Sequence, residues 1–166
     1  MVAGGPVYDS GVRVLLQRVS WARVAVDGDE VAAIGPGLLA LVGVAGGDDA
    51  DTARRMAEKT ARLRVFPDDE REFSRSVAET GGSVLCVSQF TLMGDLRRGN
   101  RPSWSAAARP EDAAPVVDAY ADALAALGTP VGRGVFGAMM TVGLENDGPV
   151  TIMLDSEDMA RPRRGA

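Results

Sequence analysis

The spacing of apolar and polar positions predicts a chain rich in strands. VRVLLQRV and ARVAVDG are rich in β-branched residues and partly alternate, and the turn sequence DGDEV leads into VAAIG, which is typical of strands joined by a hairpin. LLALVGVAG and SVLCVSQFTL are apolar on both faces, which indicates buried central strands. The expected strands are residues 12–19, 22–28, 38–46, 83–92, 131–136 and 139–144.

Two other segments carry apolar residues at helical spacing. The first, residues 50–62, follows aspartates that can cap a helix, and its basic residues lie toward its end. The second begins at Pro110, has acidic residues in its first turn, and stops at Gly128. Helices interleaved with many antiparallel-looking strands predict an α+β domain of two packed layers or a partial barrel.

Residues 144–156, LENDGPVTIMLDS, look like two apolar strands joined by a tight turn, the second strand being residues 150–154. A proline follows the turn residues, although it removes a backbone donor where strand pairing should resume. The residues alone favour an ordinary trans Gly-Pro bond, yet the added proline indicates that this corner matters for more than pairing. The turn consists of Asn146, Asp147, Gly148 and Pro149.

Composition bounds the kind of protein. The chain has 166 residues, of which 46% are hydrophobic and 25% charged, so it is long enough for one domain with a real core. No apolar run is long enough to cross a bilayer and no signal-like leader is evident, so we expect a soluble, cytoplasmic protein. The single cysteine, Cys86, lies in an apolar run, where a small buried hydrophobe is expected rather than a nucleophile.

The chain contains no histidine, and this fact excludes more types of catalytic site than any other feature of its composition. A Ser-His-Asp triad, a Cys-His pair and a His-ligated zinc site are excluded, and one cysteine cannot build a thiolate metal site. We therefore expect neither a metal nor a cofactor. A net charge of −5 argues against general adhesion to nucleic acid but does not exclude a local basic surface.

The segment 93–109 is a long loop rich in arginine and glycine. Trp104 accompanies the arginines, a mixture suited to phosphate contact and base stacking. A solvated loop whose arginines balance nearby acids is the simpler alternative. The arginines are Arg97, Arg98, Arg101 and Arg109.

The end of the strand at residues 83–92 raises a similar question. Its polar residues can be plain strand-exit residues, or they can present hydroxyls, an amide and backbone N–H groups to a ligand. The residues alone favour plain strand-exit residues and leave the ligand-binding interpretation as the alternative. They are Ser88, Gln89, Phe90 and Thr91.

Six stretches of the chain together carry a further signal: VLLQRV, IGPGLLALVGV, SQFTL, GDLRRGNRPSW, GVFGAMM and NDGPVT. They occur in order from about residue 12 to about residue 156, and with this spacing they resemble the D-aminoacyl-tRNA deacylase family, also called D-tyrosyl-tRNA deacylase. The residues before position 12 look like a mobile extension or a misassigned start, and residues 157–166 look like a mobile tail outside a single deacylase domain.

The resemblance implies a homodimeric hydrolase of the ester between a D-amino acid and the terminal adenosine of tRNA, with glycine mischarged on tRNA as a further substrate. It implies an α+β fold of two packed, mostly antiparallel or mixed sheets, barrel-like, with two main helices outside. The SQFTL residues Ser88, Gln89, Phe90 and Thr91 then surround the scissile ester. Met140 of GVFGAMM is assigned to the substrate pocket, and Arg97, Arg98 and Arg101 are assigned to tRNA phosphates.

The resemblance also implies that Gly148 and Pro149 enter the substrate pocket of the partner subunit through a cis peptide, with Arg18 holding the motif. In the cis form the two carbonyl oxygens point the same way and leave no room for an L side chain, whereas an α-ammonium and a hydrogen can approach. Because the obstacle is backbone, no rotamer change relieves it.

An aminoacyl-tRNA ester is already activated, so modest catalytic groups suffice. The backbone N–H groups of Phe90 and Thr91 are candidates for an oxyanion hole. Thr91 as a covalent nucleophile is the alternative, but the chain offers no histidine as its base. We prefer attack by water assisted by the ribose 2′-hydroxyl, with Thr91 and Gln89 in orienting roles. Asp147 is a further candidate for an acid or base, although a role as a turn residue explains it better.

Two other functions stay open on sequence grounds. The domain can be a noncatalytic tRNA-binding or fidelity module, although its intact motifs argue against a degenerate site. It can also be a general ester or peptide hydrolase, which the lack of histidine, nucleophile and metal site makes a poor choice for unactivated substrates.

Overall fold

The structure, a computed structural model, describes residues 11–163 and 165, and it is organised around one long central strand. β1 pairs along one edge with β3 and then β2, and along its other edge with β6, always antiparallel. β3 continues into the parallel pairs with β4 and β5. The strands are β1 (Arg13–Val26), β2 (Asp29–Ile34), β3 (Gly37–Gly43), β4 (Ser83–Ser88), β5 (Val131–Arg133) and β6 (Met140–Asp155).

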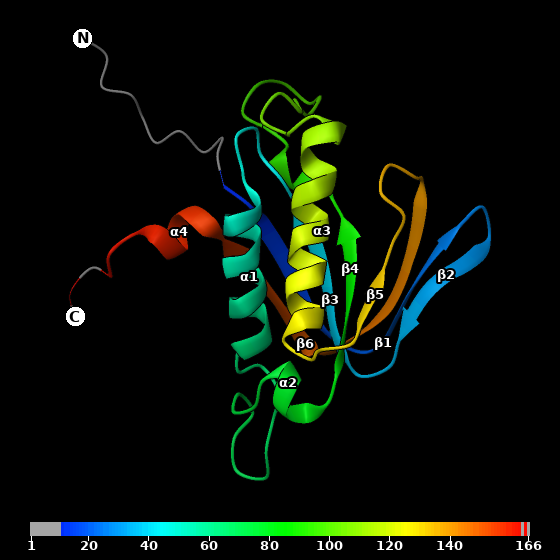
Figure 1. The fold of residues 1–166 in the computed structure, drawn as a ribbon, viewed down its shortest axis with the longest axis vertical. Coiled ribbons are helices and arrows are strands. Elements are labelled where there is room, and N and C mark those ends of the chain that lie inside the picture. Colours follow the sequence, from blue (N-terminus) through cyan, green and yellow to red (C-terminus); the bar gives the residue numbers. More distant parts are fainter. Residues whose placement is uncertain (1–10, 164, 166) are drawn as a thin grey trace.

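The sheet curls so that β2 lies against β4 and β5, while the two long helices cover its outer face (Figure 1). This arrangement confirms the predicted α+β class with a mixed, barrel-like sheet. The two expected layers of strands are two halves of one nearly closed sheet rather than separate sheets. The helices are α1 (Ala50–Arg62), α2 (Val77–Thr80), the 3-10 helix η1 (Phe90–Met93), α3 (Pro110–Ala126) and α4 (Ser156–Ala160).

The central strands bury both faces, which creates two cores. On β4, Val84 and Cys86 point toward α1 and α3, whereas Leu85 and Val87 point into the curled half of the sheet. This alternation follows from the two-residue period of a strand. Burial raises the pKa of the Cys86 thiol to about 12, which fits the small buried hydrophobe that the sequence predicts.

The helix at residues 50–62 is confirmed, and the reason is local. The Asp49 side chain accepts a hydrogen bond from the Thr52 N–H, and Met56 and Ala57 are fully buried on the inner face. The predicted helix after Pro110 is confirmed as α3, which places Glu111 and Asp112 in its first turn.

Two strand predictions need correction. Residues 12–19 and 22–28 form one strand, β1, and not a pair, because β6 pairs with it along nearly its whole length. The strand predicted for 83–92 ends at Ser88, because the chain turns into η1 at Phe90.

The hairpin predicted within residues 144–156 is wrong. These residues belong to the single strand β6, which pairs with β1 on both sides of the turn sequence. Between the pairs Val19↔Asn146 and Gln17↔Thr151, four residues of β6 oppose one residue of β1, so the motif bulges out of the ladder. The Gly148–Pro149 peptide within this bulge is cis.

The ends of the chain differ from expectation in one respect. Residues from the predicted C-terminal tail form α4, whose first turn the Asp155 side chain caps by accepting from the Glu157 N–H at 2.9 Å. Residues 1–10 of the predicted extension lie outside the described residues. Within the described ranges, no helix has the length and apolar character needed to span a membrane.

Candidate active site

The SQFTL residues form a sharp turn at the end of β4. The Gln89 N–H donates to the Val42 carbonyl at 2.7 Å, which is the last contact of this segment with β3 before η1 begins. The first N–H groups of a helix have no acceptor within it. Among the described residues, the N–H groups of Phe90 and Thr91 make no backbone hydrogen bond to another element, so they can serve a ligand.

Glycine at position 43 lets this turn lie directly on β3. A Cβ atom added to Gly43 would be 2.9 Å from the Leu92 Cβ, 2.9 Å from the Met93 Cε and 3.0 Å from the Gln89 carbonyl oxygen. These separations are too short for a side chain to fit without displacing the turn. The lack of a side chain at Gly43 therefore sets the position of η1.

A cavity of about 780 Å³ opens beside the turn. It brings the SQFTL residues together with Met140, which begins β6, and with Phe136 of the preceding loop. α3 closes another wall with Pro110 and Val117. The lining residues are Val42, Val44, Val87, Ser88, Gln89, Phe90, Thr91, Trp104, Ala107, Ala108, Pro110, Ala113, Val117, Phe136, Gly137, Ala138, Met139, Met140 and Val142.

None of the described residues that line this cavity carries an ionisable side chain. The polar side chains in its lining are those of Ser88, Gln89 and Thr91, and the Gln89 amide donates to the Thr91 hydroxyl. A site of this composition can hydrogen-bond a substrate and stabilise developing charge with fixed dipoles. It has no side chain suited to remove a proton from a nucleophile.

Two aromatic rings stand at the mouth of the cavity. Phe90 and Trp104 pack edge to face with ring centroids 5.3 Å apart, and both side chains are substantially exposed. Trp104 was singled out from sequence only as the aromatic residue of the arginine loop; its contact with Phe90 has no sequence signal. Phe136 belongs to the stretch GVFGAMM, but nothing in that stretch marks it as a residue that lines the cavity.

The Asp147–Pro149 segment lies exposed at a different place in the same chain, where Arg18 holds it. The buried Arg18 side chain donates from Nε to the Asp147 carbonyl at 3.0 Å. It also donates to the Val65 carbonyl at 2.8 Å and pairs with Glu72 at 2.8 Å. The predicted contact of Arg18 with the motif is thus present, whereas Val65 and Glu72 were not anticipated.

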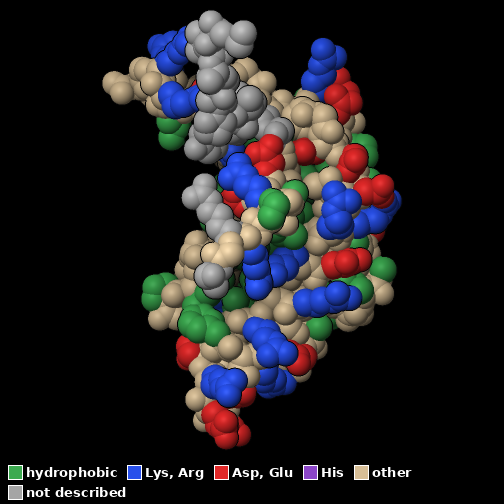
Figure 2. All heavy atoms as spheres, turned by 90° about the vertical axis from the view of Figure 1, so that its left-hand side faces the viewer, with side chains coloured by type: hydrophobic (Ala, Val, Ile, Leu, Met, Phe, Trp, Pro, Cys, Tyr) green, Lys and Arg blue, Asp and Glu red, His purple; other side chains and the backbone are tan. Residues whose placement is uncertain are grey.

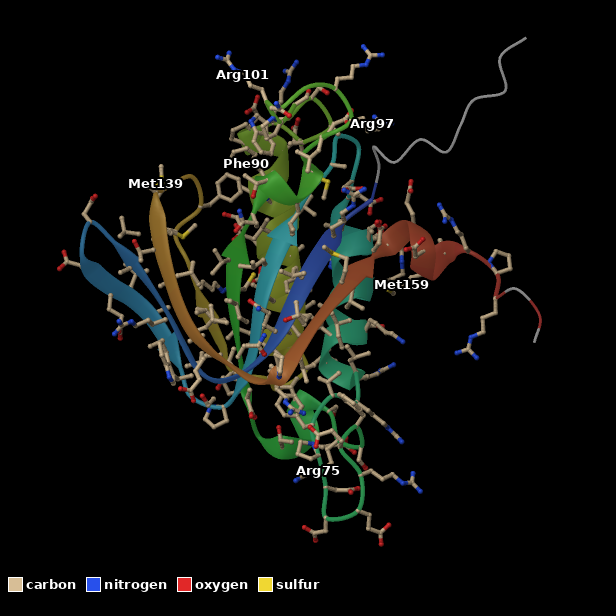
Figure 3. The ribbon with its side chains drawn as sticks, turned by 180° about the vertical axis from the view of Figure 1, so that it is seen from behind. Arg75, Phe90, Arg97, Arg101, Met139 and Met159 are labelled. Atoms are coloured by element: carbon tan, nitrogen blue, oxygen red, sulfur yellow. The ribbon has the colours of Figure 1, made fainter. Side chains whose placement is uncertain are left out.

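The register of the sheet separates this segment from the cavity. Val19 pairs with Asn146 and with Gly37, and Gly37 pairs with Ser83, so the motif lies level with the start of β4. Ser88 lies at the other end of that strand, five steps or roughly 17 Å away at about 3.3 Å per residue. In Figure 3, Phe90 and Met139 lie at one end and Arg75 at the other; the Arg75 carbonyl accepts from the N–H of Val65, the residue whose carbonyl Arg18 binds.

The arginine loop lies at the same end as the cavity. Arg97 and Arg101 extend from it beyond Phe90 (Figure 3), and both are exposed. Arg97 makes a two-pronged contact with Asp95, at 2.8 and 2.7 Å, and this contact lowers the pKa of Asp95 to about 2. Arg98 is also exposed, so the loop presents more positive than negative charge.

The face that carries α1 and α4 differs from this loop. Figure 2 shows basic and acidic side chains interspersed over it, without a patch of one sign. In the part of the chain that the structure describes, no group of three or more Asp, Glu or Cys side chains is arranged to hold a metal ion.

Comparisons with known proteins agree with one another. The family model described as D-Tyr-tRNA(Tyr) deacylase matches residues 15–155. The D-aminoacyl-tRNA deacylase of Roseiflexus castenholzii (strain DSM 13941 / HLO8) is 57% identical over 152 residues, covering 92% of this chain and 97% of the relative. The protein of the same name from Deinococcus radiodurans is 53% identical over 144 residues, covering 87% and 99%.

Solved structures give the same fold. A c-Myc DNA Unwinding Element Binding Protein superimposes with a TM-score of 0.81 at 37% identity, covering 86% of this chain and 97% of the other. A probable eukaryotic D-amino acid tRNA deacylase superimposes with a TM-score of 0.76 at 18% identity, covering 87% and 98%, a likeness that shows the fold alone.

Proposed function

Because this chain belongs to the D-Tyr-tRNA(Tyr) deacylase family, we propose that it removes D-amino acids from tRNA as a step of translation quality control. The protein is a hydrolase that cleaves the ester of an aminoacyl-tRNA. We further propose that the ester joins a D-amino acid, or glycine mischarged on tRNA, to the 3′-terminal adenosine. The enzyme acts in the cytoplasm, where charged tRNA is its substrate.

The observation that carries the mechanism is the neutral lining of the cavity, with Ser88, Gln89 and Thr91 as its polar side chains. An aminoacyl ester needs a positioned water and a stabilised oxyanion rather than a strong nucleophile. The N–H groups of Phe90 and Thr91 supply the oxyanion donors, each worth about 10²–10³ in rate in well-studied hydrolases. The ribose 2′-hydroxyl assists water, while the Gln89 amide and the Thr91 hydroxyl orient the reactants.

The role of Thr91 separates this route from covalent catalysis. A Thr91→Ala variant is expected to retain substantial hydrolysis of D-Tyr-tRNA, because its backbone N–H is unchanged. A matched Ser88→Ala variant tests the other hydroxyl of the turn. Mass spectrometry that trapped an acyl group on Thr91 would establish the covalent route instead.

Chirality is selected, in this proposal, by Gly148 and Pro149 of a second copy of the chain. Within one chain the two residues lie at the far end of β4 from the cavity, so they cannot reach their own pocket. They are exposed, and Arg18 fixes the carbonyl group that precedes them. A homodimer in which each copy inserts this segment into the other's cavity satisfies both observations.

The arginine loop is assigned to the tRNA acceptor end. Arg98 and Arg101 are exposed on the loop that contributes Trp104 to the cavity lining, where phosphates of a bound acceptor stem would pass. Substitution of either is expected to weaken binding and to make its salt dependence shallower. An unchanged salt slope would remove these residues from the binding surface.

One assay distinguishes the proposed function from its rivals. The purified protein is expected to hydrolyse D-Tyr-tRNA and Gly-tRNA, and to leave L-Tyr-tRNA intact. Binding of all three without hydrolysis would indicate a noncatalytic tRNA-binding module. Equal hydrolysis of D- and L-Tyr-tRNA, or of simple esters, would indicate a general hydrolase, and sedimentation of a monomer at assay concentrations would contradict the shared pocket.

A further inference from the structure

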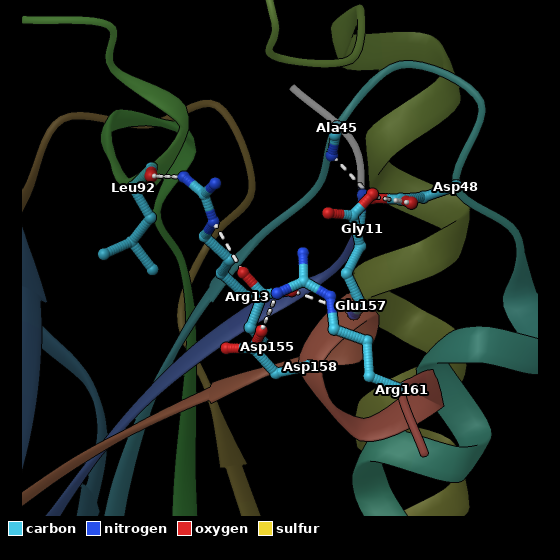
Figure 4. A network of polar contacts seen from close by, with 9 residues as sticks. All are labelled: Gly11, Arg13, Ala45, Asp48, Leu92, Asp155, Glu157, Asp158 and Arg161. Carbon is cyan, nitrogen blue, oxygen red and sulfur yellow. Dashed lines mark hydrogen bonds and ion pairs between the residues drawn. The ribbon is translucent and has the colours of Figure 1, made fainter. Parts of the chain in front are cut away.

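Arg13, the first residue of β1, contacts the turn that carries Phe90 and Thr91. Its guanidinium donates from one terminal nitrogen to the Leu92 carbonyl at 2.9 Å, and its Nε pairs with Asp155 at 3.2 Å (Figure 4). The side chains of Arg13 and Asp155 are 19% and 18% exposed, so this pair is partly screened from water. Leu92 belongs to η1, so Arg13 binds the same short helix that the candidate oxyanion donors begin.

The register of the sheet explains why Arg13 can reach the turn. Arg13 pairs with Gly43 on one side and with Asp155 on the other, so the three residues form one row across β3, β1 and β6. The bare backbone at Gly43 is where η1 rests. Arg13 is the side chain next to that gap, and Asp155 lies on its other side to orient it.

At this end of η1, Met93 is buried against Gly43, and Arg13 adds a hydrogen bond from the sheet. The N-terminal side of the turn is tied to β3 by the Gln89 N–H and the Val42 carbonyl. At the C-terminal side, the Gly94 N–H bonds only within the turn, to the Thr91 carbonyl at 3.1 Å. Among the described residues, the Leu92 carbonyl receives its side-chain hydrogen bond from Arg13.

We propose that Arg13 is a positioning residue for hydrolysis, which holds η1 so that the Phe90 and Thr91 N–H groups face the reacting carbonyl. This inference rests on the proposed function, because it assigns those N–H groups to the oxyanion. Asp155 supports Arg13 with one carboxylate oxygen and caps α4 with the other. The C-terminal helix and the catalytic turn are thereby joined through two side chains.

The activity test compares Arg13→Met, Arg13→Lys and the control Arg23→Met, which alters an exposed arginine on the same strand. Arg13→Met is expected to lower kcat for D-Tyr-tRNA by about tenfold or more, with KM nearly unchanged, because the turn acts on the transition state rather than on binding. Arg13→Lys, which keeps a charged donor, is expected to restore part of the loss. An unchanged kcat in Arg13→Met, or a lysine variant no better than methionine, would overturn the inference.

A second readout does not depend on activity. Trp104 packs against Gly94, where an added Cβ would lie 2.8 Å from the indole ring, and against Phe90. The chain has two tryptophans, so in a Trp21→Phe background Trp104 reports alone on the turn. Arg13→Met is expected to raise the acrylamide quenching of Trp104, and unchanged quenching would overturn the inference.

The two readouts separate this inference from the proposed function. If the wild-type protein leaves D-aminoacyl-tRNA intact, the proposed function fails, and the quenching of Trp104 still decides whether Arg13 positions the turn. Thermal unfolding of each variant verifies that the folded protein is being compared.

Discussion

Two arginines of β1 hold turns at opposite ends of the sheet, and they do so differently. Arg18 is 4% exposed and binds two backbone carbonyls and the carboxylates of Glu72 and Asp147, so the segment before Gly148 is fixed from inside the protein. Arg13 is 19% exposed and binds one carbonyl of η1, with a carboxylate behind it. One strand therefore supports both the proposed chiral barrier and the proposed catalytic turn.

The difference in burial matches the difference in task. A barrier that rejects a side chain by backbone contact has to be unyielding, which a buried cation with several acceptors provides. A catalytic turn has to admit tRNA and release it, so a less buried attachment is enough. We therefore expect substitution of Arg18 to lower mainly the free energy of unfolding, and substitutions near Arg13 to lower mainly kcat.

The largest effect is expected from Arg18→Met. Methionine leaves the Asp147 and Val65 carbonyls without their buried donor, so the free energy of unfolding should fall by about 2–4 kcal/mol. Urea denaturation measures this loss. The control Arg23→Met should stay within about 0.5 kcal/mol of wild type. Equal stability of the two variants would contradict the anchoring role.

Gly43→Ala tests the turn at the Arg13 end of the sheet. The added methyl group meets Leu92, Met93 and the Gln89 carbonyl, so η1 has to shift. We expect about a tenfold loss of kcat and a loss of about 1–3 kcal/mol in the free energy of unfolding. Gly46→Ala is the matched control, because nothing lies within 4 Å of its added Cβ. If the Gly43→Ala variant were as active as Gly46→Ala, the close packing of η1 on Gly43 would not be needed for catalysis.

Glu72→Gln tests how far the Arg18 anchor extends. Glu72 is 59% exposed, so its ion pair with Arg18 is screened, and we expect the ratio of D-Tyr-tRNA to L-Tyr-tRNA hydrolysis to fall by about threefold. The neighbouring Glu70→Gln variant changes the same net charge away from Arg18. If both variants give the same ratio, Glu72 has no part in chiral selection.

The smallest effect is expected from Asp95→Asn. It removes the carboxylate that pairs with Arg97, so tRNA binding should tighten and the log–log salt slope should steepen by up to about one unit. Since Arg97 lowers the pKa of Asp95 to about 2, the carboxylate stays ionised until the pH falls through that value, and the effect should not vary with assay pH above it. Asp69→Asn, at the opposite end of the molecule, is the control for net charge.

Sequence reasoning succeeded where the determinants are local. The limits of α1 follow from the Asp49 cap and the helical spacing of Met56 and Ala57, and both signals are readable in a short window. The SQFTL turn and Met140 are predictable from the motifs that contain them, and the fold brings them to one cavity.

Sequence reasoning failed where contacts between residues far apart in the sequence determine the structure. The turn residues after Leu144 are typical of a hairpin, but both flanking segments find β1 as their partner, so pairing across the sheet overrides local turn chemistry. Glu72 reaches Arg18 across 54 positions of sequence, and nothing in its neighbours signals that contact. The links of Arg13 with Leu92 and Asp155 are hidden for the same reason.

In the proposed dimer, the single strand β6 contributes both to the chain's own cavity and to the cavity of the partner subunit. Met140 forms a wall of the chain's own cavity, and eight positions later Gly148 begins the segment lent to the neighbour. From Met140 to Glu145 each residue pairs with β1, and after an irregularity in register Asn146 pairs with Val19, immediately before the bulge that carries Gly148. Any insertion or deletion there would alter the fit of both pockets at once, so the two copies can change the depth of their sites only together.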